Sequence, residues 1–226
     1  MPREPVRQAL CIALLGAEST GKTALAQALS EQISQLTGLA TTWVPEHLRL
    51  WCDQQGRTPQ AHEQRAIAEQ QQQLITAAAA SHAVVVCDTT PLMTAVYSQM
   101  VFNDHSLNAW ALQLQRGHAI TLLTALDLPW QADGLQRDGA QVQLPVDNLL
   151  RGMLMAHGLP WALVGGRGEA RLASALDAVT PMLQGLTPPR RGLFTRLAEQ
   201  DDRLALAGRG WVCGDCDQPD CEHLLR

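Results

Sequence analysis

The chain has 226 residues, 46% of them hydrophobic, and a formal net charge of −5 at pH 7. This length fits one domain of ordinary size with room for an appendage, and the hydrophobic share is enough for a sizeable core. The acidic excess argues against nucleic acid as the main partner, because phosphate contacts need a basic surplus. No apolar run approaches the roughly 20 residues of a membrane span, so we expect no membrane partner.

The N-terminus and the cysteines indicate the compartment. Residues 1–8 lack the apolar segment of a signal peptide, and the apolar run at 9–15 is short and has no convincing cleavage site. We therefore expect a cytoplasmic protein whose thiols stay reduced. The sequence predicts no particular oligomeric state.

The first strong pattern begins with that apolar run, which is typical of a buried strand. It leads into Gly16-Ala17-Glu18-Ser19-Thr20-Gly21-Lys22-Thr23, which fits the P-loop pattern G-x-x-x-x-G-K-[ST]. A helix should follow, because apolar side chains then recur at helical spacing: Leu25, Leu29, Ile33 and Leu36. A strand, a glycine-bearing loop and a helix are the context that a P-loop requires. A chance match in a glycine-bearing loop is the alternative.

The residue types of this loop suit phosphate binding. Gly16 and Gly21 carry no Cβ, so the backbone can wrap closely around a phosphate of ATP. Lys22 should reach the β- and γ-phosphates, and the Thr23 hydroxyl should bind Mg²⁺. Lys22 is the only lysine of the chain, and the other 16 basic residues are arginine. A compact ammonium therefore stands where the phosphate site needs one.

Further elements follow in alternation. The residues predict strands at 41–44, 83–88, 119–126 and 161–164. They predict helices at 45–51, 60–80, 92–100, 107–116, 146–157 and 169–183. We interpret the glutamine run at 70–73 as a solvated helix face, and residues 127–144 as a loop or lid. The alternation predicts an α/β fold of the P-loop NTPase class, with a parallel sheet and helices on both faces.

The chain changes character near residue 185. We assign residues 1–184 to a P-loop kinase or ATPase domain, and residues 185–226 to a linker, a helix and a tail rich in Cys and His. The linker contains Pro188 and Pro189. No internal repeat is visible.

Polar side chains follow the second and third strands directly. Asp88 should hold Mg²⁺ or accept the proton of an attacking hydroxyl; the alternative is a cap for the next helix. Glu46 and Arg49 share one helix face, where a carboxylate suits sugar hydroxyls or a base and an arginine suits a phosphate. A surface ion pair is the alternative for these two residues. Because ligands bind beyond the carboxyl ends of parallel strands, these residues should meet the P-loop.

Two further sites lie late in the chain. Arg137 is next to glycines in the 127–144 segment, where it can stabilise charge on a transferring phosphoryl group; a solvated loop charge is the alternative. In the tail, Cys213, Cys216, Cys221 and His223 lie within eleven residues, which suits a structural, tetrahedral Zn²⁺ site. A disordered tail that bears cysteines is the alternative.

With these pieces in view, the chain resembles the ribosylnicotinamide kinase domain of NadR and the wider NadR-like P-loop ATPases. The matching pieces run from about residue 8 to 184. They are the P-loop, Glu46 and Arg49, residues 68–72, residues 86–89, and the Pro-Trp-x-x-Asp-Gly-Leu segment at 129–135. Three positions depart from the family pattern, which are His47, Thr90 and Gln136.

The resemblance implies transfer of the ATP γ-phosphoryl group to the 5′-hydroxyl of a small-molecule nucleoside, nicotinamide riboside, in NAD salvage. We place Asp133 on the substrate side with Glu46 and Arg49. Two alternatives stay open. One is a regulatory ATPase or nucleotide switch that acts through a protein partner, and the other is a kinase for another small alcohol.

Overall fold

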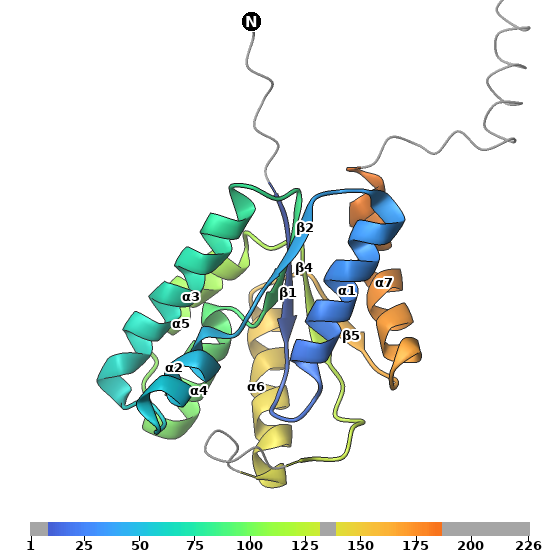
Figure 1. Cartoon of the computed structure of the whole chain (residues 1–226). Coiled ribbons are helices and arrows are strands. Elements are labelled where there is room, and N and C mark those ends of the chain that lie inside the picture. The colour runs from blue at the N-terminus through green and yellow to red at the C-terminus, as the bar shows by residue number, and fades with distance from the viewer. Residues whose placement is uncertain (1–8, 132–138, 187–226) are drawn as a thin grey trace, which may run out of the picture. The chain divides into compact units, whose positions relative to one another are not determined.

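The computed structural model describes residues 9–131 and 139–186 (Figure 1). Its strands are β1 (Leu10–Leu15), β2 (Thr41–Val44), β3 (Val84–Asp88), β4 (Ile120–Thr124) and β5 (Trp161–Val164). Its helices are α1 (Lys22–Thr37), α2 (His47–Gln55), α3 (Gln64–Ala79), α4 (Pro91–Phe102), α5 (Asn108–Gln115), α6 (Gln143–Ala156) and α7 (Glu169–Gln184). Short 3₁₀ turns cover Ala61–Glu63 and Ala140–Val142.

The five strands form one parallel sheet in the order β2-β3-β1-β4-β5. Its central strands are almost wholly apolar, as expected for a parallel sheet that is covered on both faces. The predicted class of α/β fold is therefore confirmed. Within the described residues each predicted strand and helix is present, although α4 and α6 each begin before the predicted start. The helix predicted in the segment 185–226 lies outside the described residues.

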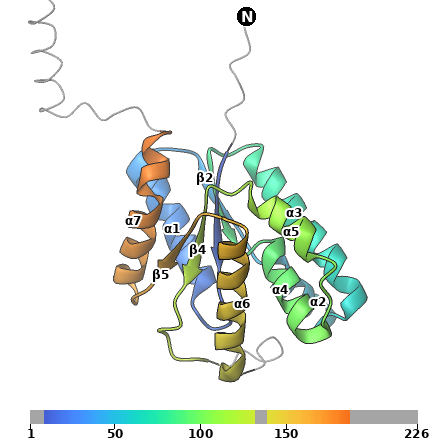
Figure 2. The ribbon, with the colours of Figure 1, turned by 180° about the vertical axis from the view of Figure 1, so that it is seen from behind.

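Helices cover both faces of this sheet (Figures 1 and 2). Helices α1 and α7 pack on one face, and α3, α4, α5 and α6 pack on the other. The strand register shows which side chains lie on each face, because successive side chains of a strand point to opposite faces of the sheet. Leu15 of β1 and Leu123 of β4 are register partners, and both join the core cluster beneath α4, α5 and α6. On the same face, Val85 and Cys87 of β3 join Ile75 of α3.

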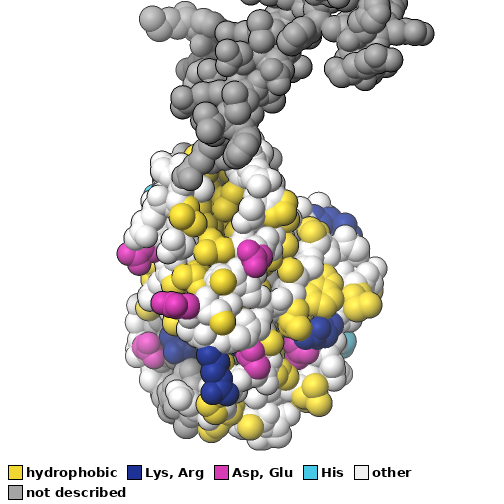
Figure 3. Space-filling model, turned by 90° about the vertical axis from the view of Figure 1, so that its right-hand side faces the viewer, with side chains coloured by type: hydrophobic (Ala, Val, Ile, Leu, Met, Phe, Trp, Pro, Cys, Tyr) yellow, Lys and Arg dark blue, Asp and Glu magenta, His cyan; other side chains and the backbone are white. Residues whose placement is uncertain are grey.

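The outer surface over α1 and α7 is mixed in character. Acidic and apolar side chains are scattered over this face, and the few basic ones lie toward its lower and right-hand edges (Figure 3). Within residues 9–131 and 139–186, no helix is both long and apolar enough to cross a membrane.

Helix α4 shows why Asp88 is not needed as a cap. The Thr90 hydroxyl accepts a hydrogen bond from the backbone N–H of Leu92, and Pro91 occupies the first helical position. The capping alternative for Asp88 is therefore wrong. Its carboxylate stays available at the end of β3.

The glutamine run in α3 differs from its interpretation as a solvated face. Gln71 is only 3% exposed. Its amide oxygen accepts a hydrogen bond from the N–H of His47 at 2.7 Å, and its amide nitrogen donates to the carbonyl of Pro45 at 3.3 Å. A long polar side chain is tolerated in the core here because the start of α2 supplies both partners. The pair of bonds fixes the backbone on either side of Glu46.

Candidate active site

The P-loop lies between β1 and α1 and is shaped by contacts with β4. A Cβ at Gly16 would collide with the Thr124 hydroxyl, so only glycine fits this position. The hydroxyls of Thr20 and Thr124 share a hydrogen bond of 2.7 Å, and Thr20 also donates to the carbonyl of Ala17 at 2.8 Å. Gly21 has a left-handed backbone, with φ of 75°, at the point where α1 begins. The loop therefore has a fixed shape without any ligand contact.

Lys22 is partly buried among carboxylates. Burial lowers the pKa of its ammonium, while the nearby carboxylates of Glu46, Asp88 and Glu18 raise it. These three carboxylates come from β3, from the start of α2 and from the P-loop itself. The structure therefore gathers these carboxylates around Lys22, although Glu18 and Asp88 are 70 positions apart in the sequence.

Asp88 ends β3 directly beside β1, where Leu14 is its register partner. Its side chain is 1% exposed, and neither carboxylate oxygen has a hydrogen-bond partner of ordinary geometry. Burial raises the pKa of this carboxyl, whereas the side chains of Thr23, Lys22 and Arg49 lower it. A buried carboxylate without a full set of partners is costly, so its retention needs an explanation such as an ion. Its oxygens and the Thr23 hydroxyl are donors that Mg²⁺ prefers.

Glu46 and Arg49 stand at the start of α2. The Glu46 carboxylate lies 3.8 Å from the Arg49 guanidinium, and their side chains are 15% and 42% exposed. This pair is not a remote surface feature, since both residues line a cavity of about 520 Å³ together with Lys22. The structure therefore brings the predicted acceptor-side residues next to the predicted phosphate lysine.

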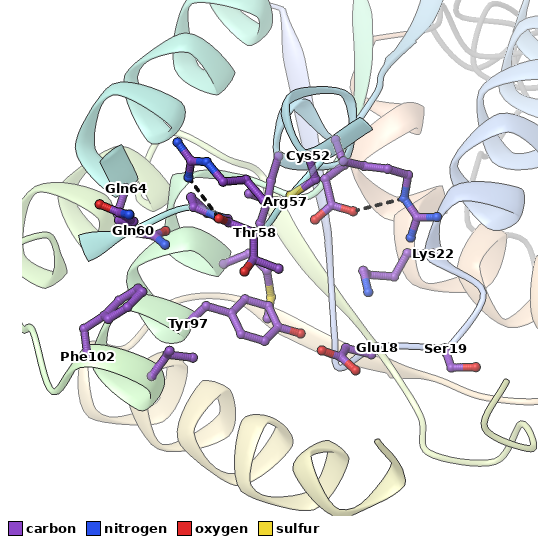
Figure 4. Close-up of a pocket in the computed structure, with 16 residues that line it drawn as sticks. Glu18, Ser19, Lys22, Cys52, Arg57, Thr58, Gln60, Gln64, Tyr97 and Phe102 are labelled. Carbon is purple, nitrogen blue, oxygen red and sulfur yellow. Dashed lines mark hydrogen bonds and ion pairs between the residues drawn. The ribbon is translucent and has the colours of Figure 1, made fainter. Parts of the chain in front are cut away.

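The cavity has an apolar wall that the sequence patterns did not indicate (Figure 4). Helix α4 contributes most of it, and α2 adds two side chains. The apolar and aromatic lining residues are Leu48, Cys52, Met93, Tyr97, Val101 and Phe102. The Tyr97 ring extends from α4 toward Glu18 of the P-loop. Helix α4 is apolar around most of its circumference, and this lack of a polar face was the signal that it borders a pocket as well as the core.

The rim of the cavity is held by an ion pair. The Arg57 guanidinium donates two hydrogen bonds of 2.7 Å to the carboxylate of Glu63, which lowers the pKa of Glu63 to about 2. The guanidinium also lies 4.9 Å from the centre of the Trp51 ring and donates to the carbonyl of Thr58. Residues 57–60 line the cavity, so this clamp shapes its opening.

Some predicted site residues lie outside the described residues. Arg137 and Asp133 belong to residues 132–138, and the tail ligands Cys213, Cys216, Cys221 and His223 belong to residues 187–226. In the part of the chain that the structure does describe, no group of three or more His, Cys, Asp or Glu side chains is arranged to hold a metal ion. The zinc site therefore stays a prediction.

Comparison with known proteins agrees with this fold. A family model described as an AAA domain matches residues 11–171. A crystal structure of NadR protein in complex with NR is similar, with a TM-score of 0.67 and 18% identity over 83% of this chain and 55% of that chain. NadR protein in complex with NAD and AMP-PNP has a TM-score of 0.62 and 16% identity, over 81% and 52%. A search of curated proteins found no match.

The chain spans about half the length of the NadR structures that it matches. At this level of identity the likeness shows the fold, and it confirms the resemblance to NadR-like P-loop proteins. The family model covers most of the chain, including the P-loop, the lining of the cavity and Asp88. The chain therefore belongs to the AAA-domain family, and it has the P-loop fold that is seen in NadR.

Proposed function

We propose that the protein is an ATP-dependent kinase that transfers the γ-phosphoryl group of ATP to a nucleoside, with nicotinamide riboside as the first candidate. One observation carries this proposal. A cavity of about 520 Å³ opens directly beside Lys22 and is lined by the carboxylates of Glu18 and Glu46 and by apolar side chains. This volume is within the range of small-molecule sites, and the apolar wall suits a flat base while the carboxylates suit sugar hydroxyls.

In this proposal the P-loop binds the ATP phosphates. Backbone N–H groups of residues 16–23 and the start of α1 surround the phosphates, and Lys22 neutralises charge on the β- and γ-phosphates. Thr23 and Asp88 would hold Mg²⁺, which fits the buried carboxylate at the end of β3, whose oxygens have no hydrogen-bond partner of ordinary geometry. When bound, Mg²⁺ neutralises charge on the phosphate oxygens.

The acceptor lies in the cavity, with its hydroxyl toward Glu46. The Glu46 carboxylate accepts a hydrogen bond from this hydroxyl and takes its proton as the oxygen bonds to the γ-phosphorus. The bond from the γ-phosphorus to the bridging oxygen breaks, and ADP leaves. Arg49 is next to Glu46 and contributes positive charge on the same side. Arg137 and Asp133 stay candidates for the transferring phosphoryl group and for the acceptor, respectively.

The deciding experiment measures ADP formation with Mg·ATP and a panel of nucleosides, with nicotinamide riboside first. A kinase gives ADP and a nucleoside monophosphate in equal amounts. A regulatory ATPase gives ADP at a rate that no nucleoside changes, and this result would overturn the proposal. The Lys22→Ala variant controls for contaminating kinases. If the protein phosphorylates another small alcohol and no nucleoside, the kinase reaction is confirmed and the nucleoside is wrong as the acceptor.

A further inference from the structure

Arg171, in the first turn of α7, reaches the P-loop. Its side chain is almost completely buried, with 4% exposed, although sequence patterns gave it no role. One guanidinium nitrogen donates to the carbonyl of Thr20 at 2.8 Å, and Nε donates to the carbonyl of Gly166, also at 2.8 Å. The remaining nitrogen pairs with the carboxylate of Asp127. A single side chain thus joins the P-loop, the segment after β4 and the segment after β5.

The charge of Arg171 is balanced where it is buried. Asp127 supplies the opposite charge, and its second carboxylate oxygen accepts a hydrogen bond from the N–H of Gly166 at 2.6 Å. A buried guanidinium that lacked such partners would strongly destabilise the fold. Because every nitrogen of the guanidinium has an acceptor, the side chain holds one orientation and the Thr20 carbonyl is held with it.

The orientation of the Thr20 carbonyl has a consequence for the next residue. A trans peptide unit is planar, so its C=O and the following N–H point in opposite directions. The described chain has no cis peptide bond. Since Arg171 draws the Thr20 carbonyl toward α7, the N–H of Gly21 points the other way. Gly21 is the residue just before Lys22, at the start of α1.

A second peptide unit of the P-loop is held in a similar way. The Gln143 side chain, at the start of α6, donates a hydrogen bond of 2.7 Å to the carbonyl of Glu18. By the same planarity, the N–H of Ser19 points away from Gln143. Ser19 has a left-handed backbone, with φ of 57°, which a non-glycine residue rarely adopts without support from its surroundings.

We propose that Arg171 and Gln143 are positioning residues that aim the N–H groups of Gly21 and Ser19 at a bound phosphate. Neither residue touches the nucleotide. They act through the carbonyls of Thr20 and Glu18, and they fix the P-loop in its binding shape before ATP arrives. The inference rests on the proposed ATP site, and it adds two residues from α7 and α6 to the determinants of that site.

The test measures binding of Mg·ATP and Mg·AMP-PNP by isothermal titration calorimetry for the wild-type chain and for Arg171→Lys. Lysine keeps the charge, but its single nitrogen cannot bond to Thr20, Gly166 and Asp127 in the fixed geometry of a guanidinium. We expect the nucleotide Kd to rise about tenfold or more, as for loss of a charged hydrogen bond. The KM of the acceptor should stay unchanged, which a general loosening of the fold would not allow. Arg151→Lys is the matched control, because Arg151 pairs with Asp147 on α6 at 2.6 Å.

A second variant covers the case in which Arg171→Lys does not fold. Gln143→Met keeps the length of a partly exposed side chain and removes only the donor to Glu18. We expect the nucleotide Kd to rise about threefold. Gln35→Met is its control, since Gln35 is exposed on α1 and its amide donates only to Glu31 at 3.4 Å.

The outcomes separate the two proposals. If wild-type protein binds nucleotide, and folded Arg171→Lys and Gln143→Met bind it equally well, the positioning inference is wrong and the kinase proposal stands. If the wild-type chain binds no nucleotide, both are wrong. If Arg171→Lys unfolds, the Gln143→Met titration against its control decides alone.

Discussion

The Nζ atom of Lys22 donates a hydrogen bond of 2.8 Å to the carbonyl oxygen of Ala17, five residues earlier. The ammonium thus contacts its own loop, while the side chain lines the cavity. A phosphate oxygen is a stronger acceptor than a neutral carbonyl, because the bond to it joins two charged groups. We expect a nucleotide to replace Ala17 as the partner of the ammonium.

The first prediction concerns this lysine. Lys22→Ala should lower kcat by a factor of about 10² to 10³ or more, because the charge is needed most as the phosphoryl group transfers. The fold should persist, since only one hydrogen bond to the loop is lost. Steady-state kinetics and circular dichroism measure the two effects. A folded Lys22→Ala protein with full turnover would contradict the P-loop assignment.

Asp88→Asn should remove activity and stabilise the fold. Burial raises the pKa of the Asp88 carboxyl in the folded protein, so the folded state binds this proton more tightly than the unfolded chain. Asp88 therefore lowers the free energy of unfolding as the pH rises through the range in which aspartate carboxyls lose their proton. At pH 7 the uncharged variant should melt about 2–4 °C higher than the wild type.

The pH dependence checks the cause of that difference. The gain in Tm should disappear near about pH 3, where the wild-type carboxyl is protonated in both states. Asp177→Asn, at an exposed position on α7, should change neither Tm nor kcat. A lower Tm for Asp88→Asn at pH 7 would mean that the carboxylate stabilises the fold and is not held there for function.

Glu46→Gln should raise the KM of the acceptor by about tenfold and lower kcat, while the KM of ATP stays within about twofold. The amide keeps the size of the side chain but accepts hydrogen bonds less strongly and takes up no proton. Glu69→Gln is the control, because Glu69 pairs with Arg65 on the exposed face of α3. If Glu46→Gln left kcat and the KM of the acceptor unchanged, the ion pair of Glu46 with Arg49 would be a surface feature only.

The rim of the cavity gives a prediction that needs no substrate. Because Arg57 holds the carboxylate of Glu63, the pKa of this side chain should be about 2. In Arg57→Gln the pKa should rise toward the ordinary range of a glutamate but stay below it, because the backbone N–H of Gln60 still donates to the carboxylate. Carbon-detected NMR of the Glu63 carboxyl measures both values. In the same variant, the KM of the acceptor should rise, since residues 57–60 line the cavity. A Glu63 pKa of about 4 in the wild-type chain would show that the clamp is absent in solution.

The tail prediction concerns residues outside the described part of the chain. We expect Cys213, Cys216, Cys221 and His223 to bind one zinc ion, separately from catalysis. Truncation after residue 186 should spare the kinase activity and remove the zinc. Elemental analysis and thiol titration measure the metal and its ligands. No stoichiometric zinc, with all three thiols freely reactive, would leave the cluster without a metal role.

The sequence by itself determined the order of the elements and the place of the phosphate site. Buried strands and amphipathic helices are recognised from residues a few positions apart, so β1, α1 and β3 were predicted close to their actual bounds. The P-loop pattern is likewise local, since its glycines and lysine act within eight residues. Asp88 and Glu46 were indicated because both follow strands, and parallel strands end at one edge of the sheet.

Only the tertiary structure decided which side chains meet across that edge. The strand order β2-β3-β1-β4-β5 arises from packing between elements that are far apart in the chain. That packing brings Arg171 to Thr20, across 151 positions, and Gln143 to Glu18, across 125. It also buries Gln71 at the start of α2, where a glutamine run alone predicted exposure. A polar residue is stable in the interior only when a partner reaches it, and no local pattern states which partner the fold will supply.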